Sequence, residues 1–210
     1  MSSAERRERE RENLRRAILD AAWELFATED YDKISMRRIA EKIDYSATAI
    51  YLHFKDKAQL MDALAAEGYA ILVSRLEVVE AADPTDRLRL LAHAYVDFAL
   101  THRPYYRLMF QYGDDKRELY GEHVERRASS GRAFEVLVSC VQGVKSSAAD
   151  AVVSEEVLLD AKVLWAHIHG AVSLMMVGSR RILESDTAAF CNRAIETAIA
   201  GLLAEHGSLA

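Results

Sequence analysis

The stretch Ser35–Lys57, which reads SMRRIAEKIDYSATAIYLHFKDK, decides how this chain folds. Its first part, Met36–Ile43, places apolar residues on a single face of a helix with 3.6 residues per turn. Its second part, Ala47–Phe54, does the same with Ile50 and Phe54. Two short helices joined by a tight turn, with the second helix free to lie in a groove, form the helix-turn-helix pattern.

Side chains that favour helix starts precede both patterns. Ser35 and Ser46 stand just before the two short helices, where a hydroxyl can accept a hydrogen bond from an unpaired backbone N–H. A capping box at Asp56–Gln59 indicates that a further helix begins directly after the motif. On the second helix, Thr48 and Tyr51 are three residues apart and share a face that differs from the apolar one.

This stretch resembles the DNA-binding domain of the TetR family of transcriptional regulators. The resemblance rests on the run of helices, on the Ile39–Ala40 pair and above all on Tyr51–Lys57, which is similar to the family's Y-x-H/Y-F-x-x-K signature. It covers roughly the first 60–65 residues. One position departs from the family pattern, because the turn has Asp44 where the family usually has Gly. Asp tolerates positive φ better than most residues, so the turn remains feasible.

The composition predicts an all-α fold. The 210 residues are 50% hydrophobic and 29% charged, with two prolines and nine glycines, and apolar patterns of helical period run nearly throughout. We predict an N-terminal three-helix domain over residues 1–60, whose first residues 1–12 form a flexible charged arm, and a larger helical domain over residues 61–210. An alternative for residues 1–12 is an extension of the first helix. Arg6, Arg7 and Arg9 would contact DNA if they form an arm.

The remaining helices follow from apolar spacing and from breaks at Pro, Gly and Ser. Expected helices span residues 13–29, 57–79, 85–102, 115–144, 154–179 and 186–205, with a short aromatic segment at Tyr105–Tyr112 and Gly113–Asp115 closing it. A loop follows Ser146. The last two helices carry apolar residues on more than one face, so we expect them to be buried against another surface. The resemblance implies a homodimer interface formed by these two helices.

Charge and cysteine content limit the choice of partners and compartment. The net charge is −6, with 12 basic and 12 acidic residues in positions 1–60 and 15 and 21 in the rest. A local basic excess at residues 33–43 is where phosphate contacts would be wanted. No apolar run reaches the ~18 residues of a membrane span, so no membrane partner is expected. Cys140 and Cys191 are too few for a disulfide framework, which favours a reducing, cytoplasmic location.

The resemblance implies a DNA-binding role for particular residues of the motif. Arg37 would bond a phosphate or a guanine edge, Thr48 would enter the major groove, and Tyr51 would place its hydroxyl on a phosphate. Alternatively Tyr51 packs at a domain edge, and His53 and Lys57 are merely solvated. The predicted DNA-binding residues are Arg37, Ser46, Ala47, Thr48, Tyr51, His53 and Lys57.

Two aromatic stretches of the second domain are candidates for a small-molecule site. Residues 165–170, which read WAHIHG, are similar to the Trp-His-Gly pattern of one TetR subgroup, and Tyr105–Phe110 is rich in aromatic residues. A mostly apolar cavity with a few polar groups is how such sites are built, although ordinary core packing is the alternative. The predicted ligand-binding residues are Tyr95, Phe98, Tyr105, Met109, Phe110, Trp165 and His169.

The sequence shows no sign of catalytic chemistry or of a cofactor. His167 and His169 are two apart on a helix and point to different faces, so they make a poor metal site. G-x-S-x-G, H-E-x-x-H and phosphate-loop patterns are absent. We therefore predict a TetR-like regulator, a ligand-responsive repressor that binds a palindromic double-stranded DNA operator as a homodimer and is released by a small lipophilic effector. The alternative is a helical protein-interaction module. The operator, the effector, the regulated genes and the choice between repression and activation stay open.

Overall fold

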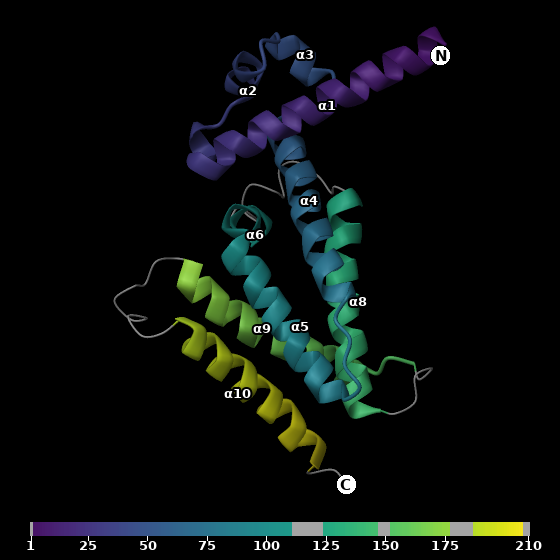
Figure 1. Cartoon of the computed structure of the whole chain (residues 1–210), viewed down its shortest axis with the longest axis vertical. Coiled ribbons are helices and arrows are strands. Elements are labelled where there is room, and N and C mark those ends of the chain that lie inside the picture. The colour runs from purple at the N-terminus through teal and green to yellow at the C-terminus, as the bar shows by residue number, and fades with distance from the viewer. Residues whose placement is uncertain (1, 111–123, 147–151, 177–186, 208–210) are drawn as a thin grey trace. The chain divides into compact units, whose positions relative to one another are not determined.

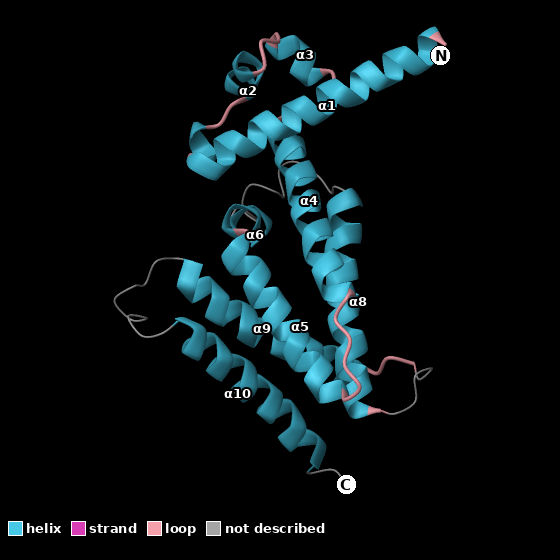
Figure 2. Cartoon of the chain, in the orientation of Figure 1, coloured by secondary structure: helices cyan, strands magenta, loops and turns pink. Residues whose placement is uncertain are grey.

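The computed structural model describes residues 2–110, 124–146, 152–176 and 187–207. Within these ranges every regular element is a helix (Figure 2), which confirms the predicted all-α class. The elements are α1 (Ser3–Thr28), the 3-10 helix η1 (Tyr31–Lys33), α2 (Met36–Lys42), α3 (Ala47–Tyr51), α4 (Lys57–Glu77), α5 (Pro84–Thr101), α6 (Arg103–Phe110), α8 (Val124–Lys145), α9 (Glu155–Met176) and α10 (Thr187–Gly207). Predicted features at residues 111–123, 147–151 and 177–186 lie outside the described residues.

The chain forms two compact units. The first contains the described residues of Met1–Gly68 and Pro104–Arg127, and the second contains those of Tyr69–Arg103 and Ala128–Ala210. The predicted domain boundary, between residues 60 and 61, lies within α4, and α4 contributes to both units. Helix α6 belongs to the first unit from Pro104 onward, although a long stretch of second-unit chain precedes it.

Helix α1 is longer than the sequence pattern indicated. It begins at Ser3 because Ser2 and Glu5 form a capping box, in which the Ser2 hydroxyl accepts from the Glu5 N–H at 3.2 Å and the Glu5 carboxylate accepts from the Ser2 N–H at 2.8 Å. Residues 1–12, predicted as a flexible arm, are therefore helical from Ser3 on. The structure agrees with the alternative in which they extend the first helix.

In the first unit, α2 packs on α1 and α3 packs on α2 (Figure 1). Ile18 and Phe26 of α1, Ile39 of α2 and Ile50 of α3 are at most 1% exposed and form the core of this unit. Their spacing is the helical periodicity seen in the sequence, so burial of these side chains determines which face of each short helix points inward. The opposite faces of α2 and α3 are left to solvent.

The second unit is a group of long helices in which α9 and α10 lie side by side and α10 also contacts α5 (Figure 1). Ion pairs join its helices. Arg89 of α5 meets Glu196 of α10 at 2.6 Å, and Arg132 of α8 meets Glu77 of α4 at 2.7 Å. Both pairs are partly exposed, so they contribute little beyond the apolar core.

Helix α9 combines buried and exposed apolar residues. Val157, Ala161 and Leu164 are buried, whereas Leu159 and Val163 are each 60% exposed. By length and composition alone, α9 is apolar enough to cross a membrane, with a mean hydropathy of 1.2 over 18 residues, of which 39% are buried. Core helices of soluble proteins meet the same criterion. The exposed apolar residues show that α9 has more apolar surface than the described part of one chain covers.

Candidate nucleic-acid interface

The turn between α2 and α3 has the geometry that the sequence predicted. The hydroxyl of Ser35 accepts a hydrogen bond from the Arg38 N–H at 3.3 Å, and that of Ser46 accepts from the Ala49 N–H at 3.2 Å, so both predicted caps are confirmed. Asp44 has φ of 58°, in the left-handed region. This positive φ allows the chain to turn sharply where a glycine is more usual, at some cost in strain.

The face of α3 that points away from the core carries three exposed side chains. Thr48, Tyr51 and Leu52 follow the i, i+3, i+4 spacing that brings side chains together on one side of a helix. Tyr51 is 53% exposed and Leu52, the residue that ends the helix, is 77% exposed. Ala47, predicted with them, is half-buried. This face is what α3 can offer to a DNA groove.

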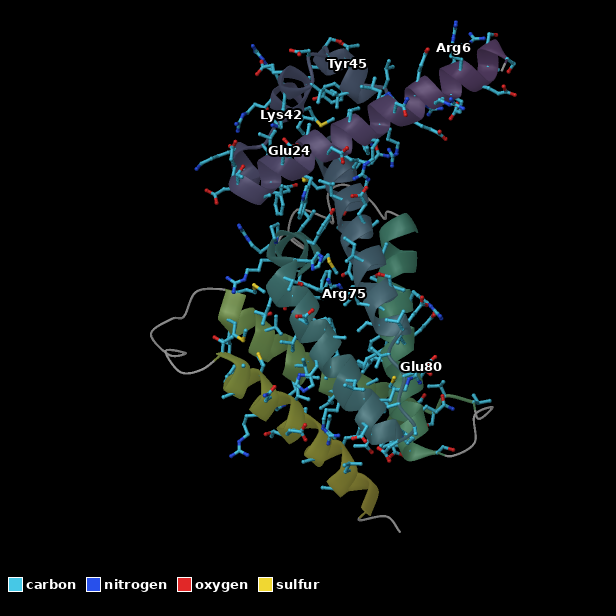
Figure 3. The ribbon with its side chains drawn as sticks, in the orientation of Figure 1. Arg6, Glu24, Lys42, Tyr45, Arg75 and Glu80 are labelled. Atoms are coloured by element: carbon cyan, nitrogen blue, oxygen red, sulfur yellow. The ribbon has the colours of Figure 1, made fainter. Side chains whose placement is uncertain are left out.

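Tyr45 extends this surface before α3 begins. Its side chain is 50% exposed, and Figure 3 shows it at the edge of the part of the first unit that α2 and α3 form. Its backbone N–H donates to the Ala40 carbonyl at 3.0 Å, which holds the turn against α2. Sequence reasoning did not single out Tyr45 or Leu52. The sequence signal that could have identified them is that both are large apolar residues at positions that the helical periodicity places outside the core.

Every cation of the predicted basic excess at residues 33–43 is paired with a carboxylate. The pairs are Lys33–Asp30 at 3.2 Å, Arg37–Glu41 at 2.8 Å, Arg38–Glu29 at 2.6 Å and Lys42–Glu24 at 2.9 Å. Figure 3 shows the last pair, Lys42 of α2 and Glu24 of α1, lying close together. The local excess is therefore largely neutralised in the folded chain.

Arg37 and Arg38 are held differently. The Arg37 side chain is 83% exposed, and its pairing with Glu41 raises the pKa of the guanidinium. An exposed pair of this kind is weak, so the guanidinium can exchange the carboxylate for a phosphate. Arg38 makes a bidentate contact with Glu29 and also donates to the Lys33 carbonyl at 2.7 Å. Arg38 thus braces α2, and Arg37 is the one of the two that is suited to DNA contact.

His53 lies at the end of the motif, beside α1. It is half-buried, and burial lowers the pKa of its imidazole, with a further contribution from the positive charges of Arg11 and Arg15. The Arg15 guanidinium stacks over the Phe54 ring, 4.4 Å from its centroid. Arg11 and Arg15, which sequence reasoning did not include, therefore belong to the surroundings of His53. Their spacing of four residues, which places both side chains on one face of α1, was the sequence signal that could have identified them.

Lys57 is tied into the first unit. Its ammonium donates to the Tyr31 carbonyl and lies 3.8 Å from the centroid of the Tyr31 ring. Lys57 begins α4, so this contact connects η1 to the start of that helix. A phosphate contact by Lys57 would have to be added to these interactions or replace them.

The structure divides the predicted ligand-binding residues between the two units. Tyr95, Trp165 and His169 come together in the second unit, where the Tyr95 hydroxyl and His169 Nδ1 are 2.7 Å apart. The Trp165 and His169 rings are 5.3 Å apart. Burial lowers the pKa of His169, which favours its neutral form. Phe98, on the same helix as Tyr95, is fully buried and stacks on His102.

The other three predicted ligand-binding residues lie on α6, in the first unit. Tyr105 stacks on Trp23 with 3.8 Å between ring centroids, and its hydroxyl donates to Glu67 at 3.3 Å. Met109 is 1% exposed. The ring of Phe110 lies 4.9 Å from that of Tyr106. The stacking of Tyr105 joins α6 to α1, and the hydrogen bond of its hydroxyl joins α6 to α4.

A capped helix-turn-helix with an exposed recognition face, in an all-helical chain, defines the class of DNA-binding transcriptional regulators. Residues 18–64 match the family model described as "Bacterial regulatory proteins, tetR family", and residues 88–198 match "Tetracyclin repressor-like, C-terminal domain". The second match alone covers more than half of the chain. The chain belongs to the tetR family of transcriptional regulators.

Curated relatives match parts of the chain. An HTH-type transcriptional repressor of Mycobacterium tuberculosis is 49% identical over 53 residues, which are 25% of this chain and 28% of that protein. The nucleoid occlusion factor SlmA of Alteromonas mediterranea is 30% identical over 127 residues, 60% of this chain and 63% of that one. The chain thus matches less than two thirds of the length of either relative.

Solved structures match over most of the chain. A protein of unknown function from Rhodococcus sp. RHA1 is 27% identical, with a TM-score of 0.72 over 90% of this chain and 94% of that one. A tetR-family transcriptional regulator from Streptomyces coelicolor is 18% identical, with a TM-score of 0.70 over 95% of this chain and 84% of that one. The second likeness concerns the fold alone.

Proposed function

We propose that this chain is a homodimeric repressor that binds an inverted-repeat DNA operator through α3 and is released by a small lipophilic effector. The observation that carries the proposal is the exposed face of α3, placed by a capped turn at the surface of the first unit. The role is one of binding rather than of catalysis. Binding to chromosomal DNA would place the protein in the cytoplasm.

The proposed DNA contacts divide between bases and backbone. Thr48 reads base edges, because a threonine hydroxyl can serve several bases and its methyl can touch thymine. Tyr51 and Arg37 contact phosphates, Arg37 after exchanging Glu41 for the phosphate. Ser46 and Ala47 approach the groove with their backbone. His53 and Lys57 support this surface from behind, since both are engaged with residues of the first unit.

The proposed dimer uses α9 and α10. Support comes from the apolar residues that these helices leave exposed, among them Leu159, Val163 and Leu203. An interface of this kind would place two recognition helices on successive major grooves, with half-site centres about 10 bp or a multiple apart. The same surface argues against a monomer, because exposed apolar area of this extent is a liability in water.

Repression and its release are proposed from one relative and from one group of side chains. One curated relative is named a transcriptional repressor, and a dimer bound over a promoter blocks access by exclusion. For an effector, the Tyr95–His169–Trp165 group offers aromatic surface with a polar contact in the second unit. The effector would act by binding one conformation of the dimer more tightly than the DNA-binding one. Tyr105, Met109 and Phe110 would then serve packing rather than ligand contact.

The first experiment is selection of genomic fragments by the purified protein across a salt series, followed by sequencing of what is retained. We expect a few fragments that share an inverted repeat, with affinity that falls steeply as salt rises. Thr48→Ala with Tyr51→Ala should weaken binding tenfold or more, since a good base contact is worth about 1–3 kcal/mol. Ser139→Ala, an exposed change on α8, is the matched control and should bind normally.

Two outcomes would contradict the proposal. Retained fragments without a common motif would favour the interaction-module alternative, in which the helix-turn-helix contacts protein. A monomer that binds one half-site in sedimentation experiments would reject the dimer through α9 and α10 while keeping DNA recognition.

A further inference from the structure

Large apolar side chains are rarely exposed in the first unit. Among its described residues, three such side chains are exposed: Tyr45 at 50%, Tyr51 at 53% and Leu52 at 77%. All three lie within eight consecutive residues around α3. Single exposed apolar residues need no explanation, but a group confined to the surface that we propose to face DNA does.

The polar capacity of the same surface is small. Helix α3 contains no charged residue, and the Ser46 hydroxyl accepts a hydrogen bond within the chain as the cap of α3. Ala47 has no polar group. Thr48 and Tyr51 are therefore the two exposed side chains of α3 that can form hydrogen bonds. The helix has no Arg or Asn, the side chains that recognise a base through two hydrogen bonds at once.

A surface of this kind matches one feature of the major groove. Of the base edges that line the groove, thymine alone presents an apolar group, its C5-methyl, while the others present donors and acceptors. Leu52 and the ring of Tyr45 can remove such methyls from water. Leu52 cannot form a hydrogen bond with a base, and Tyr45 can do so only through its hydroxyl.

We propose that Tyr45 and Leu52 contact thymine C5-methyl groups, so that this protein reads part of its half-site as a pattern of methyls. The inference rests on the proposed function and names two further specificity-determining residues. Thymines are then required at the positions opposite Tyr45 and Leu52, and uracil, which lacks the methyl, is discriminated against even though its hydrogen-bonding edge is the same as that of thymine.

Deoxyuridine tests this without altering the protein. Replacing one thymine of the selected operator by deoxyuridine removes a single methyl and keeps the base pair and its donor–acceptor pattern. We expect the dissociation constant to rise about fourfold at each contacted position, which corresponds to about 0.8 kcal/mol for one buried methyl. At thymines that contact neither these two residues nor the Thr48 methyl, the change should be negligible.

Protein variants assign the methyls to residues. In Leu52→Ala the penalty for deoxyuridine should vanish at one position, and in Tyr45→Ala at another. Combining each protein variant with each base change forms a double-mutant cycle, which isolates the contact between one side chain and one methyl. Tyr45→Phe keeps the ring and should retain the penalty. Val78→Ala, a change of an apolar side chain that is 76% exposed in the second unit, should leave both affinity and penalty unchanged. The substituted side chains are exposed, so thermal unfolding should be unaffected and serves as the folding check.

The results separate this inference from the function on which it rests. If no specific fragment is retained, the proposed function fails. If an operator is found and binds equally well with deoxyuridine at every thymine, the methyl reading is wrong while the regulator stands. A penalty that persists in both Leu52→Ala and Tyr45→Ala would also overturn the assignment, because other residues would then hold the methyls.

Discussion

Tyr105 and Tyr95 lie in two regions that contain similar aromatic residues but pack them differently. In the first unit Tyr105 is stacked on Trp23 and contacts α4 closely at Gly68. In the second unit Tyr95 shares a hydrogen bond with the half-buried His169, next to a Trp165 that is 39% exposed. One region is closed by ring stacking and steric contact, whereas the other retains an accessible aromatic surface around a polar pair.

The difference shows what an aromatic cluster can be used for. A closed cluster positions one helix on another, and any added atom disturbs it. An open cluster with a polar pair can accept a molecule with modest rearrangement. The sequence prediction placed both regions in one effector site, whereas Tyr105 lies in the first unit and Tyr95, His169 and Trp165 lie in the second, to which we assign the proposed effector. The predictions below test whether the first region is as closed, and the second as open, as their contacts indicate.

The largest expected effect is at Gly68. A Cβ at this position would lie 2.8 Å from Met109 Sδ and 2.9 Å from Tyr105 Cδ1. Gly68→Val should lower the free energy of unfolding by about 2 kcal/mol through overpacking, measured by urea denaturation at fixed protein concentration. Gly131→Ala is the control, because nothing lies within 4 Å of a Cβ there, and it should raise stability by about 0.5–1 kcal/mol. Equal effects of the two changes would show that the first region is not closed.

A smaller effect is expected at Tyr95. Tyr95→Phe removes the hydroxyl that lies 2.7 Å from His169 Nδ1. The loss should cost about 1 kcal/mol, the typical net value of an intramolecular hydrogen bond. The same denaturation experiment measures it. No change in stability would mean that water replaces the hydroxyl at no cost and that the pair is fully solvated.

Tyr105→Phe should have a still smaller effect. The hydroxyl donates to Glu67 across 3.3 Å, a long contact, and burial raises the pKa of Tyr105 to about 12, so the hydroxyl stays neutral. Removing it while keeping the stacked ring should change stability by less than about 0.5 kcal/mol. A loss larger than that of Tyr95→Phe would show that polar contacts, and not ring packing, hold α6 in place.

The last prediction concerns pH. Burial lowers the pKa of His169, so the unfolded chain binds the proton more readily than the folded one between the lowered value and the ordinary value near ~6.5. Stability should therefore fall as pH drops through that window and be fully retained above it. His53 contributes a change of the same sign. His169→Gln should reduce the difference in unfolding free energy between pH 7.5 and pH 5.5, and an unchanged difference would contradict the burial of His169.

Local patterns predicted the local structure of the motif. The two serine caps, the bounds of α2 to within a residue and the positive φ of Asp44 all follow from properties that a few neighbouring residues determine. Pairing between distant residues could not be predicted in this way. Glu24 and Glu29 neutralise cations of α2 from outside the window in which the charges were counted.

The placement of α6 illustrates the same limit. Tyr95 and Tyr105 are ten residues apart and both lie in helical aromatic patterns, yet the chain returns to the first unit between them. Nothing in the spacing of the aromatic residues marks this return. Gly68 was the one possible signal, since a glycine inside a helical pattern often marks a close approach of another element. The start of α1 has a different origin, because the Ser2–Glu5 capping box begins the helix well before its apolar pattern, in agreement with the alternative in which residues 1–12 extend the first helix.

The chain has two tryptophans, Trp23 and Trp165, and one lies in each compact unit. The Trp23 indole is covered on one side by the ring of Tyr105, whereas Trp165 is 39% exposed beside His169. Each unit therefore carries its own fluorophore. Acrylamide or iodide should quench Trp165 first, so emission that remains at high quencher concentration reports on the first unit. Binding of the proposed effector and loosening of the first unit can thus be followed separately in the unlabelled protein.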